Sequence, residues 1–167
     1  MLENVQAELN AFAKYVISQS RANLTRGKKN ASKDLWNSLK YSVKVSKNSF
    51  ELSFLMEEYG LYQDKGVSGI KKKYNTPYSY KDKMPPPRKL DKWIVRKGIA
   101  PRDKNGKFMS RKTLQFLIAR SIFTKGIKPS LFFTKPFNKA FKNLDKDLVD
   151  AFRLDVEKLM ANSINNK

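Results

Sequence analysis

Side chains able to carry chemistry are few in this 167-residue chain, because it contains no His and no Cys. That composition excludes disulfides, thiolate nucleophiles, soft metal sites and the one side chain that titrates near pH 7 without perturbation. The sequence also contains no phosphate-binding loop and no dinucleotide-binding glycine motif. We therefore expect no catalysis and no cofactor, and we predict a protein that binds or assembles.

Two clusters of acidic residues are the remaining candidates for metal ligands. Asp103, Asn105 and Gly106 form a fragment of a calcium-binding loop that lacks the terminal Glu, so a plain turn is favoured. The second cluster alternates with basic residues at helical spacing, which is typical of a solvated helix face. Its members are Asp145, Asp147, Asp150, Asp155 and Glu157. We predict a metal site in neither segment.

The positive charge of the chain is large and unevenly spread. There are 35 Lys and Arg against 15 Asp and Glu, a formal net charge of +20. Between Lys65 and Lys112, 16 basic residues face three acidic ones, so that segment holds +13 of the +20. A compact fold with such an excess repels itself unless an anionic partner or neighbour compensates it. The charge therefore predicts a polyanion contact in this segment.

Aromatic residues interleave with these basic residues. Tyr74, Tyr78, Tyr80 and Trp93 would allow stacking on bases beside phosphate contacts. No zinc finger, RNP motif or KH loop is present, so sequence-independent phosphate contact is favoured over base reading. Solvated loops would explain the same charge equally well. The residues predicted to face a polyanion or DNA are Lys71, Lys72, Lys73, Arg88, Arg96, Arg102 and Arg111.

Hydrophobic periodicity predicts the N-terminal elements that must position these residues. Apolar residues at steps of three and four predict an amphipathic helix over 2–24, and a short helix is expected over 32–39. Alternation with period two then predicts a β-hairpin with strands at 41–45 and 50–54 and a turn at 47–49.

The remaining segments are punctuated by glycine and proline. Tight turns with positive φ are expected at Gly60, Gly66 and Gly69, followed by a long irregular loop. A short helix is expected over 90–99, and a longer one between a Ser110 cap and a Gly126 stop. We expect residues 131–133 to be extended and a last helix to begin at residue 136, after a Thr134 cap.

These elements predict the α+β class. We expect a single domain over 1–167 with an N-terminal helix, a central antiparallel β-hairpin or small sheet, a basic loop-rich insert at 65–112, and C-terminal helices. The polar residues 162–167 are expected to form a frayed tail. From the sequence we expect neither a signal peptide nor a transmembrane helix.

The order of these features resembles the small tail-completion or neck proteins of tailed bacteriophages, similar to the lambda minor tail protein Z group. The likeness rests on a helix and hairpin followed by the pattern Tyr59, Tyr62, Asp64 and Gly66. A Pro-aromatic segment then opens the C-terminal helix, from Lys128-Pro129 through Pro136-Phe137. The basic residues at 71–111 depart from the compact family pattern.

The resemblance implies a structural virion protein of the phage neck or tail that catalyses no reaction. It implies a homo-oligomeric ring at the head–tail interface around the DNA channel, made in the host cytoplasm. Its partners would be portal, connector or stopper and tail proteins, with DNA in the channel and no membrane. The expected subunit-interface residues are Tyr59, Tyr62, Asp64, Gly66, Phe132, Phe133 and Phe137.

Two alternatives stay open at this level. Burial in the subunit's own core is favoured for Phe132 and Phe133 taken individually. The rival function is a monomeric or dimeric nucleic-acid-binding protein that uses the same basic segment.

Overall fold

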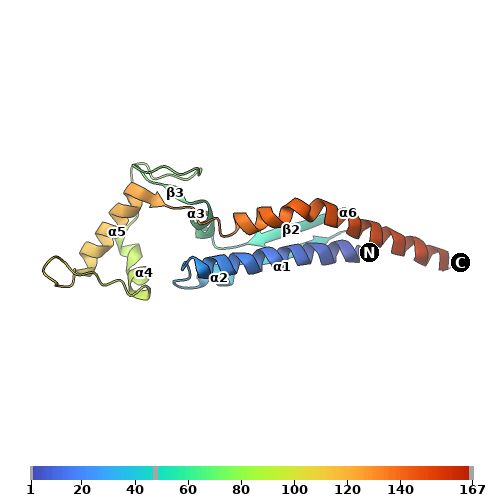
Figure 1. The fold of residues 1–167 in the computed structure, drawn as a ribbon, viewed down its shortest axis with the longest axis horizontal. Coiled ribbons are helices and arrows are strands. Elements are labelled where there is room, and N and C mark those ends of the chain that lie inside the picture. The colour runs from blue at the N-terminus through green and yellow to red at the C-terminus, as the bar shows by residue number, and fades with distance from the viewer. Residues whose placement is uncertain (1, 47–48, 166–167) are drawn as a thin grey trace. The chain divides into compact units, whose positions relative to one another are not determined.

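A computed structural model describes residues 2–46 and 49–165 (Figure 1). Two small antiparallel sheets accompany the helices, which confirms the α+β class. The chain divides into two compact units, where the sequence had predicted a single domain. We name Met1–Arg26, Trp36–Met56 and Phe132–Lys167 the helical unit, and Gly27–Leu35 with Glu57–Leu131 the basic unit. Each unit combines segments that are far apart in the sequence. The periodicity of single segments does not predict which of them pack together.

The helical unit is built on two long helices that run side by side in opposite directions, α1 (Glu3–Arg26) and α6 (Thr134–Asn165) (Figure 1). The hairpin of β1 (Lys40–Val45) and β2 (Phe50–Leu55) packs on α1. Val5, Leu9 and Ala151 form one buried cluster, which the hairpin residues Val43 and Leu52 cover. The apolar stripe predicted for α1 is therefore its core-facing side.

The predicted hairpin is confirmed, and the structure gives its register. Val43 pairs with Leu52 and Tyr41 with Phe54, so the alternating apolar residues of both strands share one face of the sheet. Residues 47 and 48 of the expected turn lie outside the described residues. The short α2 (Asp34–Ser38) precedes β1, as expected from the sequence.

An aromatic cluster fills the other end of the helical unit. The Phe12 ring lies 6.2 Å from Phe54 and 5.7 Å from Phe137, both in edge-to-face geometry. The Phe133 ring lies 5.2 Å from that of Phe54. Phe132 is 2% exposed and is among the largest fully buried side chains described. The rings of Phe12, Phe54, Phe133 and Phe137 therefore form part of the core of the helical unit, and Phe132 is buried.

The start of α6 differs from the prediction. Residues 132–133 form a turn instead of an extended segment, because Leu131 adopts a φ of 51° and reverses the chain. The helix begins at Thr134, two residues earlier than expected. It continues to Asn165, so residues 162–165 of the expected frayed tail are helical, and 166–167 lie outside the described residues.

The basic unit is organised around α5 (Arg111–Lys125). The Ser110 hydroxyl accepts a hydrogen bond from the Thr113 amide at 3.2 Å, which confirms the predicted cap. The 3₁₀ helix η1 (Pro87–Leu90) and α4 (Asp91–Arg96) pack against α5. The remaining elements are α3 (Tyr59–Lys65) and a small sheet of β3 (Val67–Ser68) and β4 (Gly126–Ile127).

Glycines in the basic unit permit close backbone approaches. Gly66 has the expected positive φ, at 75°, but Gly60 lies inside α3 and Gly69 does not adopt a left-handed φ, so those two predictions were wrong. A Cβ on Gly69 would lie 2.3 Å from the Thr124 carbonyl oxygen. Gly126 combines a φ of 73° with a hypothetical Cβ position 2.1 Å from the Val67 carbonyl oxygen. Close packing of backbone on backbone, with no room for a side chain, therefore holds β3 against β4.

No helix in the described ranges 2–46 and 49–165 is long and apolar enough to cross a membrane.

Candidate polyanion interface

The seven basic residues predicted to face a polyanion are all exposed. They belong to the basic unit, whose 22 basic and seven acidic residues give a formal net charge of +15. Arg111 has an acidic partner, since its Nε lies 3.7 Å from Asp91 Oδ1. Both groups are well exposed, so the pair contributes little to stability. Seven acids cannot neutralise 22 cations, and most of this charge therefore remains available to an anion.

The backbone holds the lysine triad, which we define as Lys71, Lys72 and Lys73, in place. The Lys71 and Lys72 amides donate to the Thr124 carbonyl oxygen at 3.0 and 3.3 Å. That carbonyl belongs to the last turn of α5, where the helix dipole is negative and favours nearby cations. The Lys72 ammonium also lies 5.5 Å from the centroid of the Tyr74 ring. The triad is thus a positioned feature of the unit.

The structure does not bring the seven basic residues into one site. Arg111 begins α5 and the lysine triad is bound to its last turn, so about 20 Å of helix separates the two at 1.5 Å per residue. Arg88 lies in η1 and Arg96 in α4. Arg102 belongs to the turn at 102–108, where its guanidinium lies 3.9 Å from the centroid of the Phe108 ring. The charge is therefore spread along the unit.

The predicted irregular loop is organised by one buried side chain, Ser68. Its hydroxyl accepts from the Tyr74 amide at 2.9 Å and donates to the Tyr74 carbonyl at 3.2 Å. The Ser68 backbone amide donates to the Tyr78 carbonyl, and its carbonyl accepts from the Tyr80 amide, both at 2.8 Å. Four hydrogen bonds on one residue fix the loop against β3. No local signal in the sequence points to this serine.

These bonds create an aromatic cleft of about 640 Å³ between α3 and residues 77–81, which we name the tyrosine cleft. Tyr62 and Tyr78 meet across it with ring centroids 4.6 Å apart in edge-to-face geometry. Val67 and Ile127 contribute apolar lining from the small sheet, and Lys81 adds a cation. The other two tyrosines that line it are Tyr59 and Tyr80.

Two tyrosines of the cleft, Tyr59 and Tyr80, have a raised pKa. Burial raises the pKa of Tyr80. Burial, followed by the nearby Asp34 and Glu57 carboxylates, raises the pKa of Tyr59, and these effects outweigh the hydrogen bonds that its hydroxyl makes to Leu35 and Ser32. The raised pKa values favour the neutral form of these two hydroxyls, which lie in the same cleft as Lys81.

The predicted subunit-interface residues divide into exposed and buried ones. Tyr59 and Tyr62 are each 45% exposed and remain available to a partner. Asp64 and Gly66 are buried inside the basic unit, where the Asp64 carbonyl oxygen accepts from the Ser130 and Leu131 amides. A Cβ on Gly66 would lie 2.6 Å from the Ile127 carbonyl oxygen. These two residues contact the segment at 127–131 and are buried within the basic unit, whereas the prediction had placed them at a subunit interface.

The aromatic residues predicted for the interface differ in exposure. Phe132 is buried in the helical unit and has no surface to offer a second subunit. Its carbonyl oxygen accepts a hydrogen bond from Asn23 Nδ2 at 3.1 Å, which ties it to α1. Phe133 and Phe137 are partly buried and stack on each other at 5.8 Å within the core cluster. Their role in this structure is packing.

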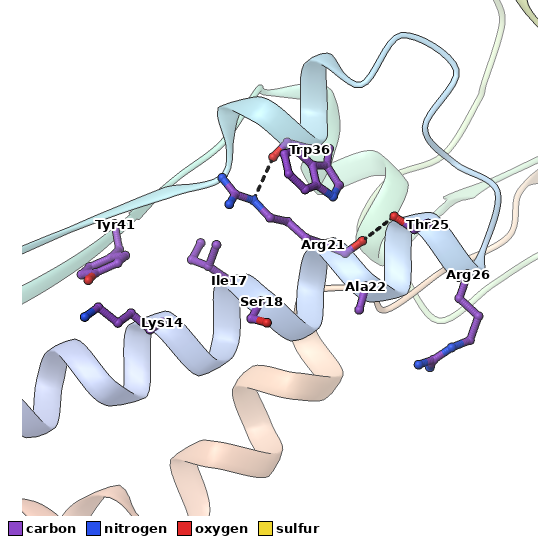
Figure 2. Close-up of a pocket in the computed structure, with 9 residues that line it drawn as sticks. All are labelled: Lys14, Ile17, Ser18, Arg21, Ala22, Thr25, Arg26, Trp36 and Tyr41. Carbon is purple, nitrogen blue, oxygen red and sulfur yellow. Dashed lines mark hydrogen bonds between the residues drawn. The ribbon is translucent and has the colours of Figure 1, made fainter.

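The helical unit carries a groove of about 800 Å³ along the second half of α1, which Figure 2 shows. Its cations are Lys14, Arg21 and Arg26, and Trp36 and Tyr41 are its aromatic lining. The Arg21 guanidinium lies 4.4 Å from the Trp36 ring centroid and donates to the Trp36 and Leu39 carbonyls at 3.2 and 3.0 Å. Arg21 therefore satisfies backbone carbonyl groups at the C-terminal end of α2 and fixes α2 to α1.

Among the described residues, no three His, Cys, Asp or Glu side chains gather where they could hold a metal ion. Asp103 Oδ1 accepts from the Asn105 and Lys107 amides at 2.9 Å, so the favoured plain turn is confirmed.

Asp155 departs from the solvated face predicted for its cluster, since it is 2% exposed. Its carboxylate accepts from the Asn4 and Val5 amides, both at 3.0 Å, and from the Asn4 side chain at 2.8 Å. Burial would raise the pKa of Asp155, but these hydrogen bonds and nearby Lys158 outweigh it and lower the pKa. The residue caps the first turn of α1 from the far end of the chain.

Comparison with known proteins gave no match: no family model, no curated protein and no solved structure is similar to this chain.

Proposed function

We propose that this chain is a structural subunit of a phage neck, a tail-completion protein whose copies form a ring at the head–tail joint around the DNA channel. The observation that carries the proposal is the apolar surface of the helical unit. Large apolar side chains of α6 are exposed along its length, at 48–68% of their area: Phe141, Val149, Phe152, Leu154, Leu159 and Met160. Monomeric proteins rarely leave such surface uncovered, and copies of the chain in a ring would bury it.

A second feature of the helical unit supports subunit association. Phe50, Val149 and Phe152 line an apolar groove of about 480 Å³ between β2 and α6. Within the described residues β1 and β2 pair with each other alone, so the outer edge of each strand can accept another strand. A neighbouring subunit, or a portal, stopper or tail protein, would satisfy both the groove and the strand edges.

The experiment compares two α6 variants that each add two negative charges. Val149→Asp with Phe152→Asp alters the apolar face, and Asn138→Asp with Asn143→Asp adds the same charge at exposed polar positions. Each variant replaces the wild-type chain in tailed particles, and native mass spectrometry follows its oligomers. We expect the first variant to lose ring formation and incorporation into particles, and the second to retain both. A wild-type chain that is absent from assembled necks would refute the proposal.

The charge of the basic unit favours a second candidate, a protein that binds nucleic acid without reading its sequence. A formal +15 on one unit, with an ordered lysine triad, supports contact with phosphates. Titration of the isolated chain with duplex DNA at several salt concentrations tests this candidate. We expect the affinity to fall steeply with salt, and an affinity independent of salt would contradict it.

A further inference from the structure

The tyrosine cleft presents exposed aromatic rings. Neither packing of the protein core nor contact with phosphates explains why these rings gather in one place. Four tyrosines from two separate segments line it, and the two on α3 are each 45% exposed. Rings that serve only as core would be covered, and scattered surface tyrosines would not share one cavity. The volume of about 640 Å³ lies within the usual range for sites that take small ligands or their fragments.

The cleft is held in shape before any ligand arrives. Ser68 binds the backbone on both sides of residue 79, through the Tyr78 carbonyl and the Tyr80 amide. The Thr76 hydroxyl donates to the Gly66 carbonyl at 3.0 Å and fixes the same loop at a second point. Little conformational freedom is lost when a ligand enters such a site, which favours binding.

The lysines beside the cleft favour an anionic ligand with flat rings, and they act against the Asp34 and Glu57 carboxylates near Tyr59. Lys81 lines the cleft, and the lysine triad lies on the same ordered loop. Every base has a π-face that can stack on tyrosine, while phosphates meet the lysines. In a duplex the base faces stack on each other and are not available to protein rings, whereas an unpaired strand offers them.

We propose that the tyrosine cleft stacks the bases of single-stranded nucleic acid, with Tyr59 and Tyr62 as the principal platforms and Lys81 beside the strand. This inference rests on the second candidate function and deepens it, because it names the state of the strand and the residues that hold it. Binding is independent of sequence, since stacking uses ring faces and not base edges.

The test measures fluorescence anisotropy with two labelled probes of equal phosphate count, an oligothymidylate and a DNA duplex. The Tyr59→Ala and Tyr62→Ala double variant is compared with Tyr59→Phe and Tyr62→Phe, which keeps both rings. Tyr15→Ala is the matched control, because Tyr15 is 38% exposed on the helical unit. We expect the alanine variant to bind oligothymidylate about 10- to 100-fold more weakly, with duplex affinity unchanged, and the phenylalanine variant and the control to behave as wild type.

Ultraviolet cross-linking of oligothymidylate to the wild-type chain, mapped by mass spectrometry, keeps the test decisive if the alanine variant unfolds. Cross-links at residues 59–62 or 78–81 support the proposal, and cross-links confined to other segments overturn it. Duplex binding with no effect of the alanine variant on oligothymidylate overturns the cleft proposal and leaves the second candidate standing. A chain that binds neither probe overturns both. A cleft that takes a proline-rich peptide and not oligothymidylate also overturns the proposal.

Discussion

The helical unit and the basic unit reach stability by different physical routes. Among the described residues, the helical unit buries eleven apolar side chains and the basic unit buries five. Their formal charges are +5 and +15. The helical unit is held by an apolar core, whereas the basic unit relies on backbone hydrogen bonds and on close approaches at glycines. A unit held in that way can carry a dense positive surface, because few of its side chains are needed for packing.

The largest expected effect is on the core of the helical unit. Phe132→Ala removes a ring that is 2% exposed, and we expect a loss of about 3–5 kcal/mol in the free energy of unfolding. Phe141→Ala is the matched control, because Phe141 is 48% exposed and should cost less than about 1 kcal/mol. Urea denaturation followed by circular dichroism measures both. Equal effects of the two changes would place Phe132 outside the core.

The corresponding test of the basic unit concerns its backbone. Gly126→Ala combines a φ of 73° with a Cβ position 2.1 Å from the Val67 carbonyl, so we expect a loss of about 3 kcal/mol. Gly98→Ala is the control, since Gly98 has a φ of 62° with open space around it and should cost about 1 kcal/mol. Hydrogen exchange should rise across 57–131 and leave α1 and α6 protected. Equal exchange in both units would show that they unfold together.

Asp155 tests the link between the two ends of the helical unit. Replacing it with Ala leaves the Asn4 and Val5 amides without acceptors, and we expect a loss of about 2–3 kcal/mol. Because the pKa of Asp155 is lowered on folding, its contribution is present above the ordinary carboxyl pKa of about 3.9. It is lost as the pH falls through the lower pKa of the folded state.

The measurement is thermal unfolding of wild type and Asp155→Asn between pH 2 and pH 7, a range chosen to bracket a carboxyl pKa of about 3.9. We expect the difference between the two proteins to shrink as the pH falls. A difference that is constant across this range would show that the carboxylate charge does not contribute.

The lysine triad tests whether the charge of the basic unit serves binding and not folding. Changing Lys71, Lys72 and Lys73 to Ala should leave thermal stability unchanged and weaken duplex binding about 10- to 100-fold near 0.1 M salt. The slope of log affinity against log salt should fall by about 3 if each lysine contacts one phosphate. The triple change of Lys139, Lys142 and Lys146 on α6 is the control. Equal weakening by both triples would mean that the location of the charge is immaterial.

The smallest expected effect concerns Ser20, a buried polar residue in the core of the helical unit. Ser20 is 0% exposed, and its hydroxyl has no hydrogen-bond partner among the described residues. Ser20→Ala removes an unsatisfied polar group from a helix and favours helical propensity, so we expect a gain of about 1 kcal/mol. Chemical denaturation measures the gain. Destabilisation would show that the hydroxyl is satisfied in solution.

The sequence by itself determined the features that depend on near neighbours. The stripe on α1, the two strands of the hairpin, the Ser110 cap and the Gly126 stop all follow from spacings of two to four residues, where periodicity and capping operate. Counting charged residues along the sequence also located the charge excess between Lys65 and Lys112, because such a count requires no knowledge of the structure.

Only the tertiary structure decided how distant segments combine. Asp155 looked like one acid on a solvated face until it met Asn4, 151 residues away. Asp64 and Gly66 looked like interface residues until the segment at 127–131 packed over them. No local sequence pattern indicated a role for Ser68, although its four hydrogen bonds hold the loop that forms the tyrosine cleft. The physical reason is that a hydrogen bond or a close contact between segments far apart depends on both partners, and neither segment's own pattern records the other.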